Sequence, residues 1–345
     1  MNVETGWEFD RPPQLQASQP PEARGLPRDG IRLMVTHGSS IEHRRFHDLP
    51  RLLHPGDLLV VNRSATLPAS LPARGTFGPF RLNLSTQYGP AVWLAEPRWA
   101  FDRPGPVPLQ DDDPFDVAGV RARAVARYPG IDRLLFVRVD GDLRAAMATV
   151  GEPIRYAYVP APLPLTEYQT VFGAVPGSAE MPSAGRPFTR SLLRALGERR
   201  VGLASILLHT GVSSLEVGDA ADGVPIYPEP FDVPAETVEA IARTREDGHR
   251  VIGVGTTVVR ALESAHDDAG ILRPARGFTQ AYLRPGRPVR SVDGLITGWH
   301  EPRSTHLALL ASVAGATSLR RAYAAAVDAG YLWHEFGDSH LLLRG

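Results

Sequence analysis

The sequence contains no cysteine and no lysine, and each absence excludes a class of chemistry. Without cysteine the chain has no disulfide bond, no thiolate nucleophile and no thiolate-bound zinc or iron–sulfur centre. Without lysine, Schiff-base catalysis and the lysine of a phosphate-binding loop are excluded as well. All 37 basic residues are therefore arginines. We attribute this bias to a genomic base composition that favours Arg, Ala, Gly and Pro codons.

The sequence also lacks a long apolar run, a signal-peptide pattern and a large net charge. Hydrophobic residues make up 43% and charged residues 22% of the chain, as in an ordinary globular protein. We therefore expect a soluble, cytoplasmic protein without membrane contact. The formal net charge of −1 provides no global basic field of the kind typical of nucleic-acid-binding proteins.

What is abundant is glycine and proline, 33 and 32 of 345 residues, which predicts many short elements and structured turns. From about 71 to 152, short alternating segments separated by Pro, Gly and Asp predict a small antiparallel β-barrel or sandwich. Before and after it, strand and helix patterns alternate. We therefore predict an α/β fold: a large mixed, barrel-like α/β domain formed by residues 1–70 and 153–345, with a small β-barrel domain inserted at 71–152.

Turn and cap residues place several individual elements. Thr189 is a good N-cap for a helix over 190–196, and Gly197 a good C-terminal stop. Residues 1–30 are polar and proline-rich and predict an extended arm. The other main predictions are strands over 31–36, 41–46, 58–61, 201–209, 251–255 and 291–297, and helices over 234–247, 257–266 and 303–314.

The segment from Val251 to Thr257 places two glycines and two threonines where a strand becomes a helix. A helix N-terminus offers free N–H groups and the positive end of the helix dipole, which suit a carboxylate or a phosphate. Gly255, Thr256 and Thr257 are therefore candidate ligand contacts. A tight turn with a threonine cap explains the same residues equally well. Arg260 and Glu263 follow three residues apart on that helix, as a surface ion pair or as part of the site.

Two further segments carry polar residues beside apolar elements. His209 ends a predicted apolar strand, where it can transfer protons near neutral pH or simply hold the loop. His300, Arg303, Ser304 and Thr305 precede a predicted helix, and an arginine there can grip a carboxylate with two hydrogen bonds. A plain helix start would explain the two hydroxyls, but less naturally the histidine and the arginine together. Asp338 lies in a predicted turn, and we predict no metal site.

The order of these segments resembles that of the S-adenosylmethionine:tRNA ribosyltransferase-isomerase family of queuosine synthesis, and the resemblance runs over nearly the whole chain. The segments that carry it are Phe46-His-Asp-Leu-Pro50, Pro55-Gly-Asp-Leu-Leu59, Tyr168-Gln-Thr-Val171, Leu208-His-Thr-Gly211, Val254-Gly-Thr-Thr257, Arg260-Ala-Leu-Glu-Ser264, His300-Glu-Pro-Arg-Ser-Thr305 and Phe336-Gly-Asp338.

The resemblance implies a large α/β domain with an inserted β-barrel, and an enzyme without a metal or redox cofactor. It implies transfer and rearrangement of the ribosyl group of S-adenosylmethionine onto 7-aminomethyl-7-deazaguanine in tRNA, giving epoxyqueuosine and releasing adenine and methionine. His209 and His300 then become the candidates for proton transfer. Arg303, Thr256 and Thr257 become candidates for the methionine carboxylate. The remaining candidates for the site are Glu229, Gly255, Arg260, Glu263, Ser304, Thr305 and Asp338.

The sequence departs from the family pattern at several places inside otherwise matching motifs. Arg63 stands in a motif that has lost an aspartate and an arginine, Pro187 and Tyr227 each replace a histidine, and Gln280 replaces an aspartate. Changes of this kind indicate an altered acceptor site.

Three functions are therefore weighed. The first is the family reaction on tRNA. The second uses S-adenosylmethionine or a related nucleoside on a small-molecule acceptor or in a cyclisation, without tRNA. The third is a catalytically silent binder of nucleoside or RNA, and the retention of four residues argues against it: His209, Arg260, His300 and Arg303.

Overall fold

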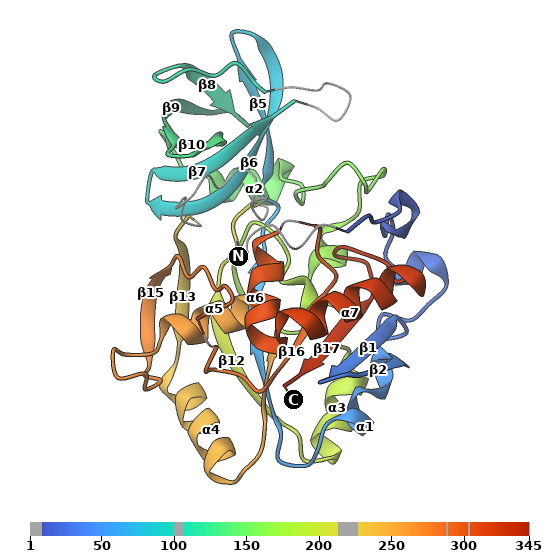
Figure 1. Cartoon of the computed structure of the whole chain (residues 1–345). Helices are drawn as coiled ribbons and strands as arrows, with labels where there is room; N and C mark the ends of the chain where they lie inside the picture. Colours follow the sequence, from blue (N-terminus) through green and yellow to red (C-terminus); the bar gives the residue numbers. More distant parts are fainter. Residues whose placement is uncertain (1–8, 100–105, 213–226, 288, 303, 345) are drawn as a thin grey trace.

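The computed structural model describes residues 9–99, 106–212, 227–287, 289–302 and 304–344. A large α/β domain carries a closed antiparallel β-barrel at one end (Figure 1). The predicted fold class, α/β with an inserted small β-barrel, is confirmed. Within the described ranges, none of the helices has the length and apolar character needed to cross a membrane.

The large domain is built on a nine-stranded mixed sheet in the order β15-β13-β12-β3-β14-β16-β17-β1-β2, with β15 and β2 at its edges. Its four central strands, β12, β3, β14 and β16, run parallel to one another. The strands are β1 (Arg32–His37), β2 (Ser40–Arg45), β3 (Leu58–Asn62), β12 (Gly202–Leu208), β13 (Glu229–Val233), β14 (Val251–Val254), β15 (Ala275–Thr279), β16 (Gly294–Gly298) and β17 (Ser339–Leu343).

Both faces of this sheet are buried, as the side-chain alternation of β3 illustrates. Leu58 and Val60 belong to the apolar core on one face, while Leu59 and Val61 belong to the core on the other. Residues of α4 to α7 join the first core, and residues of α1 and α3 join the second. The helices are α1 (Leu49–Leu52), α3 (Arg190–Glu198), α4 (Ala235–Glu246), α5 (Thr256–Ser264), α6 (Thr305–Ala314) and α7 (Ala316–Asp328).

The small domain is a closed antiparallel barrel in the order β10-β7-β6-β5-β8-β9, followed by helix α2 (Leu143–Val150). Alternate residues of its strands point inward: on β9, Ala122 and Ala124 are buried and alternate with the exposed Arg121, Arg123 and Val125. The barrel strands are β5 (Ser70–Gly75), β6 (Gly78–Gly89), β7 (Val92–Arg98), β8 (Pro114–Val117), β9 (Val120–Tyr128) and β10 (Ile131–Val139). A separate parallel pair, β4 (Ser64–Thr66) and β11 (Val175–Ser178), lies outside both sheets.

Local predictions at the helix caps meet different outcomes. The Thr189 side chain accepts a hydrogen bond from the Leu192 N–H, so the predicted N-cap of α3 is confirmed. The predicted stop at Gly197 is wrong, because α3 continues to Glu198 and the left-handed residue that follows is Arg200, with φ of 61°. The predicted extended arm over residues 1–30 is also corrected in its described part, which contains two short 3-10 helices (Pro13–Leu15 and Pro21–Arg24).

Candidate active site

A cavity of about 310 Å³ opens at the carboxyl ends of the central parallel strands. Thr210 follows β12, Gly255 follows β14 and Trp299 follows β16, and all three residues line it. Strand β13 runs antiparallel to β12, and β17 runs antiparallel to β16, so the amino ends of β13 and β17 reach the same edge of the sheet. Ligands of α/β sheets bind outside the carboxyl ends of the strands, where the connecting loops diverge.

The first wall of the cavity is the N-terminus of α5. Gly255 has φ of 94°, a left-handed conformation that suits glycine, and it turns β14 directly into the helix. Gly255, Thr256 and Thr257 all line the cavity. The N–H groups of a first helical turn have no partner within the helix, and they carry the positive end of its dipole. This wall therefore offers hydrogen-bond donors, as the sequence predicted for a carboxylate or a phosphate.

A buried ion pair stands beside this wall. Arg260, one turn into α5, bonds through Nη1 to the carboxylate of Glu229, at the start of β13. Glu229 Oε1 also accepts a hydrogen bond of 2.7 Å from the Gly211 N–H. The Nη2 atom of Arg260 is buried without a hydrogen-bond partner among the described residues, although the side chain lines the cavity. Glu229 thus fixes the guanidinium of Arg260 and leaves its Nη2 available to a ligand.

The second wall combines His300 with the first turn of α6. His300 Nε2 lies 2.9 Å from Thr297 Oγ1, and its carbonyl accepts a hydrogen bond of 3.1 Å from Trp333 Nε1. Burial, reinforced by the neighbouring histidines, lowers the pKa of His300 well below its ordinary value. The ring is therefore neutral at pH 7.

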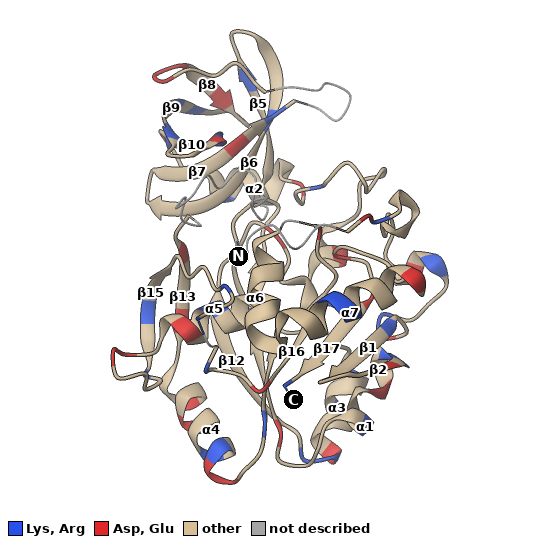
Figure 2. Cartoon of the chain, viewed as in Figure 1, with Lys and Arg blue, Asp and Glu red and all other residues tan. Residues whose placement is uncertain are grey.

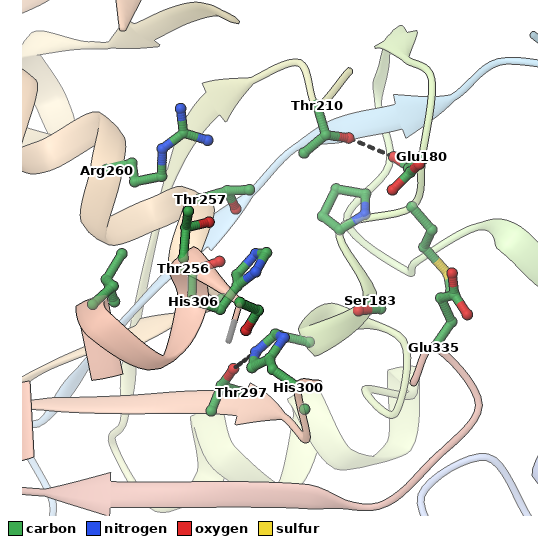
Figure 3. A pocket seen from close by; sticks show the side chains of 18 of the residues that line it. Glu180, Ser183, Thr210, Thr256, Thr257, Arg260, Thr297, His300, His306 and Glu335 are labelled. Atoms are coloured by element: carbon green, nitrogen blue, oxygen red, sulfur yellow. Dashed lines mark hydrogen bonds between the residues drawn. The ribbon is translucent and has the colours of Figure 1, made fainter. Parts of the chain in front are cut away.

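His306 also lines this wall, and the sequence analysis missed it (Figure 3). Its ring stacks on His300, with centroids 4.3 Å apart and planes inclined by 3°. Burial and the positive charge of Arg260 lower the pKa of His306 to about 4. The available signal was its place in the first turn of the predicted helix over 303–314, where a titratable residue stands directly before an apolar run.

Three residues were predicted at the start of the helix over 303–314; two of them line the cavity, and the third lies outside the described residues. Ser304 and Thr305 line the cavity. Ser304 is the N-cap of α6, yet its hydroxyl makes no capping hydrogen bond, and Oγ is buried without a partner among the described residues. Arg303 lies outside the described residues, so its role in carboxylate binding stays a prediction.

The side of the cavity opposite Arg260 is aromatic and acidic. Tyr158 stacks against Tyr156 at 5.8 Å and against His334 at 4.5 Å. The hydroxyl of Tyr156 donates to Glu180, and that of Tyr158 donates to Glu335. In Figure 3, Glu180 and Glu335 lie across the cavity from Arg260. These five residues were not predicted, because the two tyrosines and the loop with His334 are far apart in the sequence and match no motif.

His209 lies outside the lining of this cavity. Its Nδ1 is 2.7 Å from Ser64 Oγ, and its ring packs so closely on Gly177 that a Cβ there would lie 2.3 Å from it. Burial, with a contribution from Arg144, lowers the pKa of His209. The described contacts are those of a histidine that holds the loop between β12 and β13, and its predicted role in proton transfer stays a prediction.

Two other predicted site residues anchor the backbone behind the cavity. Glu263 accepts hydrogen bonds from the N–H groups of Arg290 and Ser291, at 2.7 and 2.8 Å. Asp338 accepts one bond of 2.8 Å from each of the Arg32 and Leu332 N–H groups and pairs with the Arg32 guanidinium at 3.0 Å. Neither carboxylate lines the cavity, so any influence on a ligand passes through the segments that they hold.

The four departures from the family pattern lie in different environments. Tyr227 lines the cavity and is buried, with its hydroxyl donating to the Val212 carbonyl at 2.7 Å. Pro187 is buried just before α3, Arg63 is half-buried, and Gln280 is exposed. Only Tyr227 among these four belongs to the lining of the cavity, so the structure places one departure where it would meet a ligand.

Comparison with known proteins gives matches over nearly the full length. A family model described as "Queuosine biosynthesis protein" matches residues 5–342. Curated relatives named S-adenosylmethionine:tRNA ribosyltransferase-isomerase are 38% identical over 345 residues in Thermus thermophilus and 37% over 347 residues in Moorella thermoacetica, each alignment covering 98% of both chains. A crystal structure of S-adenosylmethionine tRNA ribosyltransferase from Thermotoga maritima is similar at a TM-score of 0.54 and 28% identity, covering 98% of this chain and 99% of that one.

Proposed function

The chain belongs to the queuosine biosynthesis protein family, and on that premise we propose that it is an S-adenosylmethionine:tRNA ribosyltransferase-isomerase. The enzyme transfers and rearranges the ribosyl group of S-adenosylmethionine onto 7-aminomethyl-7-deazaguanine in tRNA, forming epoxyqueuosine and releasing adenine and methionine. Because tRNA is its second substrate, we place the enzyme in the cytoplasm.

The observation that carries this proposal is the convergence of separate sequence segments on one cavity. Glu229, the stretch from Gly255 to Arg260 and the segment from His300 to Thr305 come from three parts of the chain, and the described residues named from them line the same 310 Å³ space. The last two of these parts contain motifs that carry the family resemblance. Arg260, His300 and His306 lie on one side, and Glu180 and Glu335 lie on the other with the stacked rings of Tyr158 and His334.

This arrangement suits chemistry on a sulfonium nucleoside. A sulfonium acidifies the neighbouring C–H bonds, so a neutral base can begin the rearrangement by removing one of these protons. His300 fits that step because burial keeps its ring neutral. If its Nε2–H donates to Thr297 Oγ1, the lone pair on Nδ1 is left to accept the proton. Adenine departs with a proton supplied by an acid in the same cavity.

Because the chain has no large net positive charge, tRNA has to be recognised through local clusters of side chains. Basic and acidic residues are interspersed along the ribbon of both domains (Figure 2), in keeping with the net charge of −1. The proposed reaction needs no metal and no redox cofactor. Protein passed over a chelating resin before the assay should therefore retain its activity.

The test is adenine release from S-adenosylmethionine, with and without tRNA that carries 7-aminomethyl-7-deazaguanine, together with mass spectrometry of the digested tRNA. Adenine release that depends on this tRNA and gives epoxyqueuosine supports the proposal. Release without tRNA supports the small-molecule alternative, and absence of both release and binding overturns both. His300→Ala should lower turnover by about a hundredfold or more, while the exposed His47 provides a matched control as His47→Ala.

A further inference from the structure

Buried polar atoms without hydrogen-bond partners are rare in folded proteins, and each one calls for an explanation such as a missing ligand. The described part of the chain has ten such side-chain atoms, and four of them belong to residues that line the cavity. These four are Arg260 Nη2, Trp299 Nε1, Ser304 Oγ and His306 Nδ1. Every one of them can donate a hydrogen bond. An occupant of the cavity must therefore present acceptors to this side.

Ser304 gives the most specific indication. A serine at the N-cap normally accepts a hydrogen bond from a backbone N–H in the first turn of its helix. Ser304 is the N-cap of the ten-residue helix α6, is 5% exposed and makes no such bond. Its hydroxyl is thus left for a ligand beside a helix N-terminus at which the Leu307 N–H already donates to the Ser304 carbonyl, at 3.0 Å. An acceptor with two oxygen atoms can satisfy a hydroxyl and a helix N-terminus together.

Arg260 and His306 supply the remaining donors from the same side. Arg260 is fixed by Glu229 through Nη1, which leaves Nη2 unpaired. His306 lies near enough to Arg260 for the guanidinium charge to depress its pKa, and both residues are labelled on the same side of the cavity in Figure 3. A neutral imidazole donates through one ring nitrogen, and the unpartnered nitrogen of His306 is Nδ1. One formal positive charge accompanies these donors.

We propose that Arg260 Nη2, Ser304 Oγ and His306 Nδ1 form the subsite for the α-carboxylate of the methionine part of S-adenosylmethionine, at the N-terminus of α6. This proposal rests on the proposed function and fixes the orientation of that substrate. The carboxylate lies against α6, and the sulfonium and the ribosyl group extend toward the side of Glu180 and Glu335. The subsite binds and orients the substrate, and His306 acts there as a hydrogen-bond donor.

A phosphate group of tRNA presents similar acceptors, so the test has to separate the two anions. S-adenosylmethionine and its decarboxylated analogue share the adenosine and the sulfonium and differ only in the carboxylate. Their dissociation constants are measured by calorimetry without tRNA, for the unchanged protein and for Ser304→Ala, His306→Phe and His306→Asn. Phenylalanine keeps the stacking on His300, and asparagine keeps a donor near the position of Nδ1. Ser312→Ala is the matched control, because Ser312 lies on the same helix with its hydroxyl bonded to the Ala308 carbonyl.

We expect the unchanged protein to bind S-adenosylmethionine at least about tenfold more tightly than the decarboxylated analogue, as for the loss of one charge-assisted contact. Ser304→Ala and His306→Phe should each weaken S-adenosylmethionine binding about tenfold and leave the analogue within about twofold. His306→Asn should restore most of the affinity, and Ser312→Ala should change neither ligand.

Equal binding of the two ligands by the unchanged protein would overturn the subsite, and so would variants that weaken both ligands alike. Variants that leave the binding of both ligands unchanged would overturn it too, and weaker tRNA binding by the same variants, measured in a separate titration, would assign these donors to a phosphate. Adenine release, assayed separately, distinguishes this failure from failure of the proposed function. If adenine is released but the two ligands bind equally well, only the subsite is overturned. If the two ligands bind with different affinities but no adenine is released, only the proposed reaction is overturned.

Discussion

The imidazole rings of His300 and His306 lie parallel, with centroids 4.3 Å apart and planes inclined by 3°. Two protonated rings at this separation would repel each other, and burial adds to the cost of charging either one. Both rings are therefore neutral in the folded protein at pH 7. One histidine can then act as a base while the other donates a hydrogen bond, and neither needs to be charged before the substrate binds.

Buried neutral histidines make stability depend on pH in a defined direction. The pKa is about 4 for His306 and about 3 for His340, both below the value of about 6.5 in an unfolded chain. Between these values and pH 6.5 the unfolded chain binds more protons, so stability falls as the pH drops below 6.5. Each such histidine contributes about 1.4 kcal/mol per pH unit to this slope. Urea unfolding at pH 7.5, 6.5 and 5.5 should reveal the decrease.

The variant His340→Gln measures how much one buried histidine contributes to this pH dependence of stability. Glutamine can keep a hydrogen bond to Thr36, whose Oγ1 lies 3.0 Å from His340 Nε2, but it cannot titrate. The slope of stability between pH 6.5 and 5.5 should fall by about 1 kcal/mol per unit, because the unfolded histidine is only half protonated at pH 6.5. The exposed His47, changed to glutamine, is the control expected to leave the slope alone. Equal slopes in His340→Gln and the unchanged protein would contradict the assignment.

The Arg260–Glu229 pair should separate stability from activity. Arg260→Ala leaves the Glu229 carboxylate buried without its cation, which should cost about 3 kcal/mol of unfolding free energy. The double variant Arg260→Met with Glu229→Gln removes both charges, so it should recover most of this stability while adenine release stays low. Urea unfolding and the adenine assay measure the two effects. Recovery of activity together with stability would show that the guanidinium is not needed by the ligand.

The sequence predicted best where local chemistry determines the structure. The step from Val254 to Thr256 combines an apolar strand, a left-handed glycine and a helix start within a few residues, and it lies at the cavity as part of the predicted site. Likewise, the hairpin of β1 and β2 and the N-cap at Thr189 depend on neighbours in the chain. Such features need no information about distant residues.

Other features depend on contacts between distant segments. Glu229 begins a strand, β13, that contains Pro230, which cannot donate to a sheet ladder and argues against a strand. Pairing with β12 and β15 overrides that local preference. The stack of Tyr158 on His334 joins residues 176 positions apart, and no local pattern could reveal it.

The two histidines named from the sequence should respond differently to substitution. His300→Ala removes a cavity-lining ring and should lower the rate of adenine release by about a hundredfold or more. His209→Ala removes a ring packed on Gly177 and bonded to Ser64, so we expect a loss of about 2 kcal/mol in stability and release within about threefold of the unchanged protein. Single-turnover assays below the melting temperature of both variants make the comparison. A comparable loss of rate in both variants would show that His209 also takes part in catalysis.

Asp338 should act on the substrate through the loop that it closes. Its carboxylate binds the Arg32 and Leu332 N–H groups and so holds the segment that carries His334 and Glu335 to the cavity. In Asp338→Asn an amide NH₂ replaces one acceptor, and stability should fall by about 2 kcal/mol. The displaced loop should raise KM about tenfold while kcat falls less than threefold, because the proton-transfer groups on the other wall are untouched.

Asp293→Asn is the matched control for this effect. Asp293 also uses its carboxylate to hold a backbone N–H, that of Val251 at 2.9 Å, but at the amino ends of β14 and β16, away from the cavity. It should lose a similar amount of stability without a change in KM. If Asp338→Asn and Asp293→Asn alter KM alike, the effect reflects general destabilisation. If only Asp338→Asn alters KM, the turn before β17 helps to position the substrate, although Asp338 itself does not line the cavity.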